Sequence, residues 1–459
     1  MNNRRAWATS TPARTTSSFL PRHPVRPAHR GGVGGSRTEA LTYLEATVGD
    51  TGRSTSRERK EAFVDGIEDF VVTAEKHGLV FARSTDYPDY YPELPGGKIG
   101  RAIEVKPLNS KVIGKWWKTI SAPAGMPIKT DDVWLLGRAW STPAGFLRGA
   151  QFVFRALGGV VRGQRLVGIG AGLSTAFRHA VVLKHEVPLW LNAPLEELLT
   201  TDGRVTGVRI TRDGQPLTVR ATRGVMLAGG GFDHNTEWRR SLPYSIIVDA
   251  HGDRFANESE SYVDLGHHML EHDKDGAYWM IADVRHARRY LRTFALDPKN
   301  NKAMREAGIM AKGSTLAELA ARIGIDPARL QATADRFNGF ARSGVDGDFG
   351  RGNSAYDRYY GDPTVHPNPC LGPLEKGPFT AFKVVIGDLG TKGGVLTDAE
   401  GRALREDGTV IDGLYAAGNN SASVMGRTYP GPGSTIGPAV VFGMRAARHM
   451  ARWPSASTS

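Results

Sequence analysis

Two short motifs near the C-terminus combine residue types that could bind a flat cofactor and polarise a substrate beside it. The run 413–419 is apolar and ends in small residues, which let a bulky ligand lie directly against the backbone. The run 429–433 is rich in glycine and proline and precedes a helical pattern that continues to Met450. Backbone N–H groups at the start of a helix stabilise electron-rich atoms. The motifs predict a flavin-ring site with contacts from Ala417, Gly418, Asn419, Ser434, Thr435 and Ile436.

The tyrosine of the second motif could polarise a ketone. Proline fixes its own φ, so the turn that carries Tyr429 is rigid, and Gly433 has no side chain to obstruct its N–H. A phenol and an N–H together form a two-donor site for a ketone oxygen that becomes an enolate. One such donor typically contributes ~3 kcal/mol in the transition state. An isolated tyrosine more often packs at a domain boundary, but the Pro-Gly-Pro-Gly context favours the donor site.

The C-terminal motifs and three earlier segments resemble the 3-ketosteroid Δ1-dehydrogenases, flavoproteins of the fumarate-reductase-like group. The earlier segments are 86–97, 245–259 and 362–373, and they occur in the family's order. The resemblance extends from about Thr38 to Trp453. It implies FAD as cofactor and an α/β fold. That fold is a two-dinucleotide-binding (Rossmann-like) flavoprotein domain, incomplete here, with an inserted α+β substrate domain.

The resemblance also implies roles for individual residues in removing two hydrogens from C1–C2 of a 3-ketosteroid. Tyr429 and Gly433 would polarise the 3-oxo group, Tyr262 would take the C2 proton, and the flavin would take the C1 hydride. Tyrosine has a pKa near 10, so a tyrosine base at neutral pH costs up to about 4 kcal/mol. The Tyr90 phenol, by hydrogen bonding to the Tyr262 anion, would offset part of that cost. The remaining expected flavin contacts are Gly229, Gly230 and Gly231.

Other activities stay open beside this interpretation. A fumarate-reductase-type enzyme would need a cationic pocket for a dicarboxylate, whereas tyrosines suit a neutral, flat and apolar substrate. A related steroid dehydrogenase acting at C4–C5 has similar requirements, although the Tyr-Pro-Gly-Pro-Gly turn favours the Δ1 type. A flavin-free remnant that only binds steroid would keep the substrate pocket without turnover.

Two pieces of the family pattern are absent from this sequence. No strand followed by a Gly-x-Gly-x-x-Gly turn stands near the N-terminus, and the glycines of 168–172 have the wrong spacing for that fingerprint. The family inserts several dozen residues after a segment like 229–235, whereas here 238–243 leads directly to Ser245. A flavin without its pyrophosphate cradle loses a strong anchor. A truncated, catalytically silent family member is therefore an alternative hypothesis.

Local signals predict the order of elements around these motifs. A capping box at Thr55 and Glu58 predicts the start of a helix, Asp213-Gly214 predicts a hairpin, and Asp326-Pro327 predicts another helix start. The predicted parts are a disordered Arg-rich arm (1–37), the first part of the FAD-binding domain (38–240), the substrate domain (241–392) and the C-terminal part of the FAD-binding domain (393–459).

Composition narrows the function further. The formal net charge is +12, but seven arginines and no acidic residue lie in the first 38 residues, so the charge belongs mainly to the arm and no nucleic-acid partner is expected. The histidines show no metal-ligand spacing, and the single Cys370 excludes an internal disulfide. No apolar stretch has transmembrane length. We therefore expect a cytoplasmic protein that allows peripheral membrane contact. The resemblance implies an enzyme of steroid metabolism, with a 3-ketosteroid substrate and an unidentified electron acceptor as partners.

Overall fold

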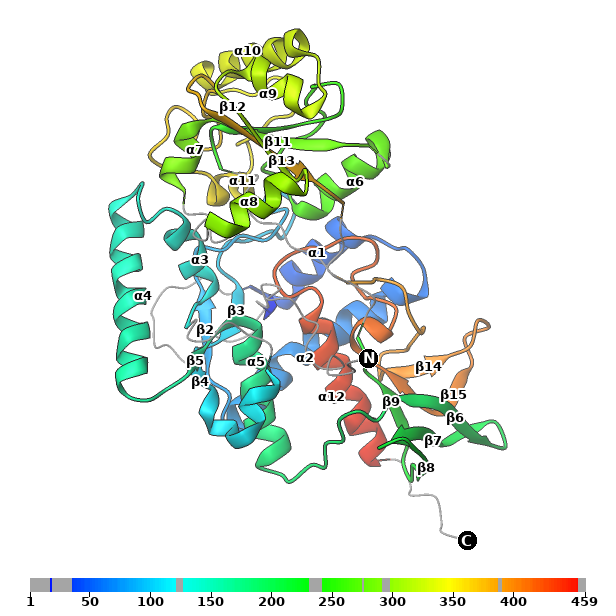
Figure 1. Cartoon of the computed structure of the whole chain (residues 1–459). Coiled ribbons are helices and arrows are strands. Elements are labelled where there is room, and N and C mark those ends of the chain that lie inside the picture. Colours follow the sequence, from blue (N-terminus) through cyan, green and yellow to red (C-terminus); the bar gives the residue numbers. More distant parts are fainter. Residues whose placement is uncertain are drawn as a thin grey trace. The chain divides into compact units, whose positions relative to one another are not determined.

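The computed structural model describes residues 17–18, 35–120, 127–230, 242–274, 276–290, 298–386 and 390–452, which Figure 1 draws in colour. The chain divides into two compact units. The first unit comprises 1–130, 156–235 and 388–459, and the second comprises 131–155 and 236–387. Residues 131–155, which the sequence placed in the FAD-binding domain, thus group with the second unit. Most of the expected arm lies outside the described residues.

Helices form much of the first unit. They are α1 (Arg37–Val48), η1 (Arg53–Thr55), α2 (Arg57–Lys76), η2 (Ser110–Thr119), α5 (Ile169–Phe177), η3 (Arg178–Leu183), η5 (Gly418–Asn420) and α12 (Ile436–Arg452). The predicted helix start at Thr55 is wrong by one residue, because Ser56 is the N-cap of α2 and accepts from the Arg59 N–H. The Thr55 hydroxyl is already engaged, since it donates to the Gly52 carbonyl and accepts from the Thr51 N–H.

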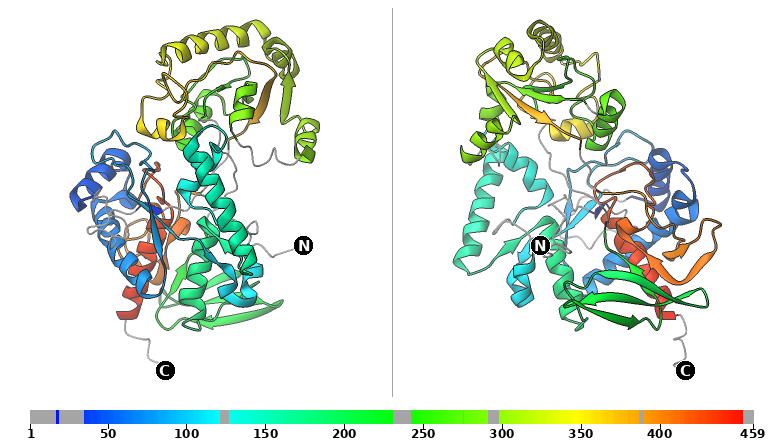
Figure 2. Two further views of the ribbon diagram at one scale, coloured as in Figure 1. Left: turned by 90° about the vertical axis from the view of Figure 1, so that its left-hand side faces the viewer. Right: turned by 45° about the vertical axis from the view of Figure 1, so that its right-hand side comes forward.

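Two of these helices pack closely and form the core beneath the C-terminal motifs. The apolar face of α2 is buried, and it includes Phe63, Ile67 and Phe70. A Cβ on Gly66 would lie 2.5 Å from the Val441 Cγ1 atom of α12, so only glycine permits this approach. Figure 2 shows α2 in blue beside α12 in red. The start of α12 is therefore held against a rigid support.

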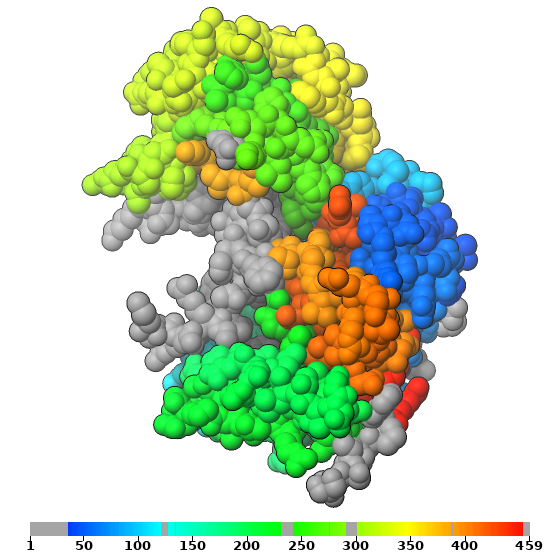
Figure 3. Space-filling view, turned by 90° about the vertical axis from the view of Figure 1, so that its right-hand side faces the viewer, coloured from blue at the N-terminus to red at the C-terminus, as the bar shows by residue number. Residues whose placement is uncertain are grey.

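The strands of the first unit form small sheets, in which one pair is parallel. Strand β9 (Val225–Leu227) runs parallel to β15 (Val410–Ala416), and β14 (Arg402–Leu404) pairs with β15 in the antiparallel sense. A second sheet contains β6 (Leu195–Thr201), β7 (Arg204–Arg212) and β8 (Gln215–Arg220). The hairpin predicted across Asp213-Gly214 is confirmed. Val205, Ala403 and Leu414 form a buried cluster between these sheets, which appear in green and orange in Figure 3.

The glycines of 168–172 do not belong to the sheet of β9 and β15. They follow β5 (Leu166–Val167), which pairs with β4 (Leu108–Asn109) in the antiparallel sense. A Cβ on Gly168 would lie 2.1 Å from the Ile128 carbonyl oxygen, so this glycine allows a close backbone approach. This placement agrees with a packing role and not with a dinucleotide fingerprint. The remaining strands are β1 (Ser17–Ser18), β2 (Phe81–Ser84) and β3 (Ala102–Val105), which form a third sheet.

The second unit contains an antiparallel sheet and several helices. Its strand order is β10 (Ser245–Val248), β11 (Tyr278–Ala282), β13 (Phe379–Val384) and β12 (Met310–Gly313). The helices include α6 (Tyr262–Asp273), α7 (Val284–Arg289), α8 (Pro298–Glu306), α9 (Leu316–Ile323), α10 (Pro327–Ser343) and α11 (Ala355–Tyr360). Helix α3 (Thr130–Gly137) begins at the boundary of this unit, and α4 (Pro143–Val161) crosses it after Arg155. The helix start at Asp326-Pro327 is confirmed, since the Asp326 carboxylate caps α10.

Candidate active site

The parallel pairing of β9 with β15 brings two of the predicted glycine-rich segments together. Because the strands are parallel, their carboxyl ends meet at one edge, where ligands of open α/β sheets bind. Gly229 and Gly230 follow β9, and the Gly230 N–H donates to the Asn420 side-chain oxygen at 2.8 Å. The Ala417 N–H donates to the Leu227 carbonyl at 3.1 Å. Gly231, the third predicted contact of this group, lies outside the described residues.

The turn before α12 presents unsatisfied backbone donors. The Ser434 hydroxyl donates to the Gly431 carbonyl at 2.6 Å and closes the turn. Gly433 is buried at a φ of 89°, a conformation that favours glycine. Among the described residues, the N–H groups of Gly433, Thr435 and Ile436 have no hydrogen-bond acceptor. This end of α12 therefore carries the partial positive charge that electron-rich ligand atoms require.

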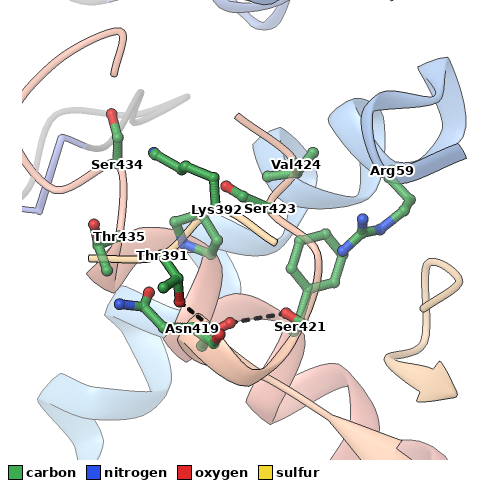
Figure 4. Close-up of a pocket in the computed structure, with 12 residues that line it drawn as sticks. Arg59, Thr391, Lys392, Asn419, Ser421, Ser423, Val424, Ser434 and Thr435 are labelled. Atoms are coloured by element: carbon green, nitrogen blue, oxygen red, sulfur yellow. Dashed lines mark hydrogen bonds between the residues drawn. The ribbon is translucent and has the colours of Figure 1, made fainter. Parts of the chain in front are cut away.

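A pocket beside this turn combines hydroxyl, amide and cationic groups, as Figure 4 shows. Its lining residues are Arg59, Thr391, Lys392, Gly418, Asn419, Ser421, Ser423, Val424, Ser434, Thr435, Pro438 and Phe442. No carboxylate is among these lining residues of the described chain. Withdrawal from water lowers the pKa of the Lys392 ammonium to about 8 and that of the Arg59 guanidinium to about 10.

These features fit the ring system of a flavin. Ala417 and Gly418 place no bulky side chain at this edge, and the start of α12 supplies N–H donors for the polar edge of a flat ligand. The buried Arg59 Nε atom has no hydrogen-bond partner in the described part of the chain. It is therefore a donor that an acceptor atom of a ligand could bind. Neither of the two strands of the parallel pair in the described residues continues into a Gly-x-Gly-x-x-Gly turn.

The structure places Tyr90 against Tyr429. The two rings are stacked with centroids 5.4 Å apart at an interplanar angle of 23°. The Tyr90 N–H donates to the Pro430 carbonyl at 3.0 Å, and the Tyr43 hydroxyl donates to the same carbonyl at 2.5 Å. The turn that carries Tyr429 is therefore held by two segments from the N-terminal half of the chain. Tyr43, on α1, is a residue that sequence reasoning missed.

The loop that carries Tyr90 has its own buried anchor. The Asp89 carboxylate accepts from the Arg101 Nε atom at 2.8 Å and from the Lys98 N–H at 2.8 Å. Both side chains of the Asp89–Arg101 pair are buried. The Arg101 guanidinium also lies over the Tyr43 ring, 4.6 Å from its centroid. This arrangement fixes the backbone from which the Tyr90 ring extends.

Lys392 is the second residue that sequence reasoning missed. Its Nζ atom lies 4.6 Å from the centroid of the Tyr429 ring. The signal in the sequence is weak, since one lysine stands before two glycines in 391–394. Nothing in that local pattern indicates which aromatic ring the lysine contacts.

Tyr262 belongs to the second unit. It is the first residue of α6, and the preceding Ser261 caps the helix by accepting from the Asp264 N–H at 3.2 Å. The approach to Ser261 is fixed by the buried Glu258 carboxylate, which accepts from Arg254 and Arg351. Burial alone would raise the pKa of Glu258, but the two guanidinium groups outweigh it and hold that pKa below its ordinary value.

The parallel strand pair ends in small residues beside a helix start whose N–H groups lack acceptors among the described residues, an arrangement typical of flavin-binding oxidoreductases. The family model described as FAD binding domain matches residues 19–244 and 239–436. The 3-oxosteroid 1-dehydrogenase of Mycolicibacterium smegmatis is 39% identical over 93% of this chain and 88% of its own length. The 4-oxocyclohex-2-ene-1-carboxylate 5-dehydrogenase of Sinomonas cyclohexanicum is 32% identical over 94% and 86%, respectively.

A solved structure agrees with these matches. The 3-ketosteroid Δ1-dehydrogenase of Sterolibacterium denitrificans, in complex with 1,4-androstadiene-3,17-dione, has a TM-score of 0.85 and 30% identity over 97% of this chain and 92% of its own. The chain belongs to the 3-oxosteroid 1-dehydrogenase family. Its cofactor is FAD, and the predicted α/β flavoprotein fold is confirmed.

The comparisons also bear on the missing internal segment. The match to the Mycolicibacterium smegmatis enzyme extends over 513 aligned positions, more than the 459 residues of this chain. The relative therefore has residues at positions where this chain has none. The two pieces of the family match meet at residues 239–244, where the sequence predicted a short connection.

Within the described ranges, no three histidine, cysteine or acidic side chains lie close enough to hold a metal ion. In the same part of the chain, no helix combines the length and the hydropathy needed to cross a bilayer.

Proposed function

We propose that this enzyme removes two hydrogens from C1–C2 of a 3-ketosteroid and forms a double bond between these carbons. The observation that carries the proposal is the buried Gly433 N–H without an acceptor among the described residues, on the same turn as the Tyr429 phenol. Two donors on one rigid turn suit a ketone oxygen that gains negative charge. The relatives named above support the choice of a ring ketone.

The site residues of the first unit divide into those that hold FAD and those that bind the ketone in this proposal. Asn419, Ser434, Thr435 and Ile436 would hold FAD at the edge formed by β15 and the start of α12. FAD, when bound, accepts the hydride from C1. Tyr429 and Gly433 would bind the 3-oxo oxygen and thereby acidify the C2–H bond. Tyr90, through its stacking contact, would keep the Tyr429 ring in place.

We assign the proton acceptor to Tyr262 on the basis of its position in the family pattern. Its phenolate oxygen would take the C2 proton and become a neutral phenol while the C1 hydride leaves, so that the electron pair of the C2–H bond forms the new double bond. Tyr262→Phe should therefore lower kcat about 10³-fold with an unchanged thermal unfolding midpoint. Turnover within a few-fold of the parent would remove Tyr262 from the mechanism.

The absorption spectrum of the purified full-length protein, alone and with added FAD, tests the proposal. We expect an oxidised-flavin spectrum that a 3-ketosteroid bleaches without air. A parallel sample with 4-oxocyclohex-2-ene-1-carboxylate tests the smaller ring ketone in the name of the Sinomonas relative. Bleaching by that compound and not by the steroid would make the smaller ketone the proposed substrate. A colourless protein that takes up no FAD would indicate a silent family member, and steroid binding by such a protein would indicate a remnant that only binds.

Peripheral membrane contact and cytoplasmic location are further parts of our proposal. On α4, the Phe146, Leu147 and Phe154 side chains are each more than half exposed, whereas Arg148 and Arg155 turn to the buried Asp132 carboxylate. Exposed aromatic residues on one helix face support contact with a lipid surface. Flotation with anionic phospholipid vesicles and cell fractionation test these two points. A Phe146→Ser/Phe154→Ser variant should float less.

A further inference from the structure

We propose that Lys392 is a positioning residue for the reaction, whose ammonium lies over the Tyr429 ring and strengthens the Tyr429 hydroxyl as a donor to the enolate oxygen. This inference rests on the proposed function, in which Tyr429 binds the 3-oxo group. The sequence pattern did not assign a role to Lys392. Its role would be electrostatic, exerted through Tyr429 and not by contact with the reacting atoms.

The position of the ammonium is well defined by its surroundings. The Nζ atom lies 4.6 Å from the Tyr429 ring centroid, within the range of a cation–π contact. The Lys392 carbonyl accepts from the Ser423 N–H at 3.0 Å, so the backbone on which the side chain stands is tied to the next segment. The Thr391 hydroxyl donates to the Asn419 carbonyl at 3.5 Å. The lysine is thus held from both sides in the same pocket as the predicted flavin contacts.

The charged groups of the described residues around Lys392 do not neutralise its ammonium. No carboxylate of the described residues lies within ion-pair distance of its Nζ atom. The other cation of the pocket, Arg59, donates to the Ser54 and Ala422 carbonyls. The start of α12 adds a further partial positive charge, and Tyr429 is the titratable group in contact with the lysine. Because no carboxylate of the described residues forms an ion pair with it, the ammonium can act on negative charge that forms beside it.

The Lys392 ammonium can affect the rate because negative charge develops next to Tyr429 during the reaction. A cation near a phenol stabilises its anionic form more than its neutral form, which makes the hydroxyl a stronger hydrogen-bond donor. When C2 loses its proton, negative charge moves to the 3-oxo oxygen, and the Tyr429 hydroxyl shares that charge. The cation therefore stabilises the transition state more than the ground state, which is the condition for a rate effect. Desolvation, which lowers the pKa of Lys392 to about 8, strengthens this interaction.

A double-mutant cycle tests the inference. Lys392→Met should lower kcat about tenfold with little change in KM, a size expected for a desolvated cation–π contact. Lys392→Arg should restore most of the rate because the charge is retained. In a Tyr429→Phe background, Lys392→Met should have no further effect, since the group through which it acts is gone. The exposed Lys76→Met serves as the matched control and should leave kcat unchanged.

Ligand affinities distinguish this electrostatic role of Lys392 from a structural one, because only the electrostatic role favours a ligand that resembles the enolate. A steroid with an aromatic ring A and a 3-hydroxyl group mimics the enolate. Its dissociation constant, read from the flavin spectrum, should rise about tenfold in Lys392→Met, while that of the corresponding 3-ketosteroid changes by less than about twofold. If Lys392→Met fails to fold, Lys392→Gln takes its place in both experiments.

The outcomes separate the two proposals. A normal rate in Tyr429→Phe would contradict the proposed function itself. A slow Tyr429→Phe together with a normal rate in Lys392→Met would overturn only the role of Lys392. An equal loss from Lys392→Met in the Tyr429→Phe background would also overturn that role, because the lysine would then act independently of Tyr429.

Discussion

Two groups of cations withdrawn from water, one in each unit, have different partners. In the second unit, Arg254 contacts Glu258 and Asp346, each at 2.9 Å, and Arg351 contacts Glu258 at 3.0 Å. In the first unit, Lys392 and Arg59 line a pocket that contains no carboxylate among its described lining residues. The first arrangement neutralises its charges within the fold. The second leaves positive charge facing a ligand site.

The difference concerns how the desolvation cost of each group of cations is offset. A buried charge without a partner carries a large desolvation cost, which a fold normally offsets with an opposite charge or hydrogen bonds. The Arg254–Glu258–Arg351 network meets that requirement and fixes the segment before Tyr262. The pocket does not meet it internally, which is the arrangement expected where a ligand supplies the negative charge. We therefore expect substitutions in the network to affect stability and substitutions at the pocket to affect chemistry.

The largest effect should come from breaking the network. Glu258→Ala leaves the fully buried Arg351 guanidinium without its carboxylate partner, so we expect a loss of about 3–5 kcal/mol in the free energy of unfolding. Urea unfolding measures this loss. The exposed pair of Arg342 and Glu375 provides the control, because Glu375→Ala should change stability by less than about 1 kcal/mol. Equal effects of the two substitutions would contradict the structural role of the network.

The next largest effect should come from a substitution at the pocket of the first unit. Tyr429→Phe removes one donor to the developing oxyanion, and we expect kcat/KM to fall about 10²–10³-fold. The thermal unfolding midpoint should stay within about 1 °C, since the ring and its stacking on Tyr90 are retained. Steady-state assays with a dye as electron acceptor measure the rate. A large loss of stability would show that the Tyr429 hydroxyl serves the fold instead.

The smallest effect should be a gain in stability. Lys392→Met replaces a half-buried ammonium that has no acidic partner in the described residues, so we expect unfolding to require about 1 kcal/mol more free energy. Thermal unfolding of the flavin-free full-length protein measures this change. A clear destabilisation would mean that the pocket cation is structural, like the arginines of the network, and would remove the contrast between the units.

Much of the local structure could be predicted because it depends on neighbouring residues. The hairpin at Asp213-Gly214 and the helix start at Asp326-Pro327 depend on φ angles and caps that a few residues determine. The shift from Thr55 to Ser56 shows the limit of such signals. Two hydroxyl residues compete there for one helix start, and the contacts of Thr55 with Gly52 and Thr51 decide between them.

The sequence alone determined the family through its resemblance in four segments. Its C-terminal motifs also indicated the flavin site, because glycine, proline and tyrosine at these spacings restrict the backbone and the chemistry together. Only the tertiary structure decided which distant segments meet. The parallel pairing of β9 with β15 joins residues nearly two hundred positions apart, and it creates the edge where the predicted contacts gather. The contact of Lys392 with Tyr429 arises in the same way. Such contacts depend on how helices and sheets pack, and no local pattern encodes them.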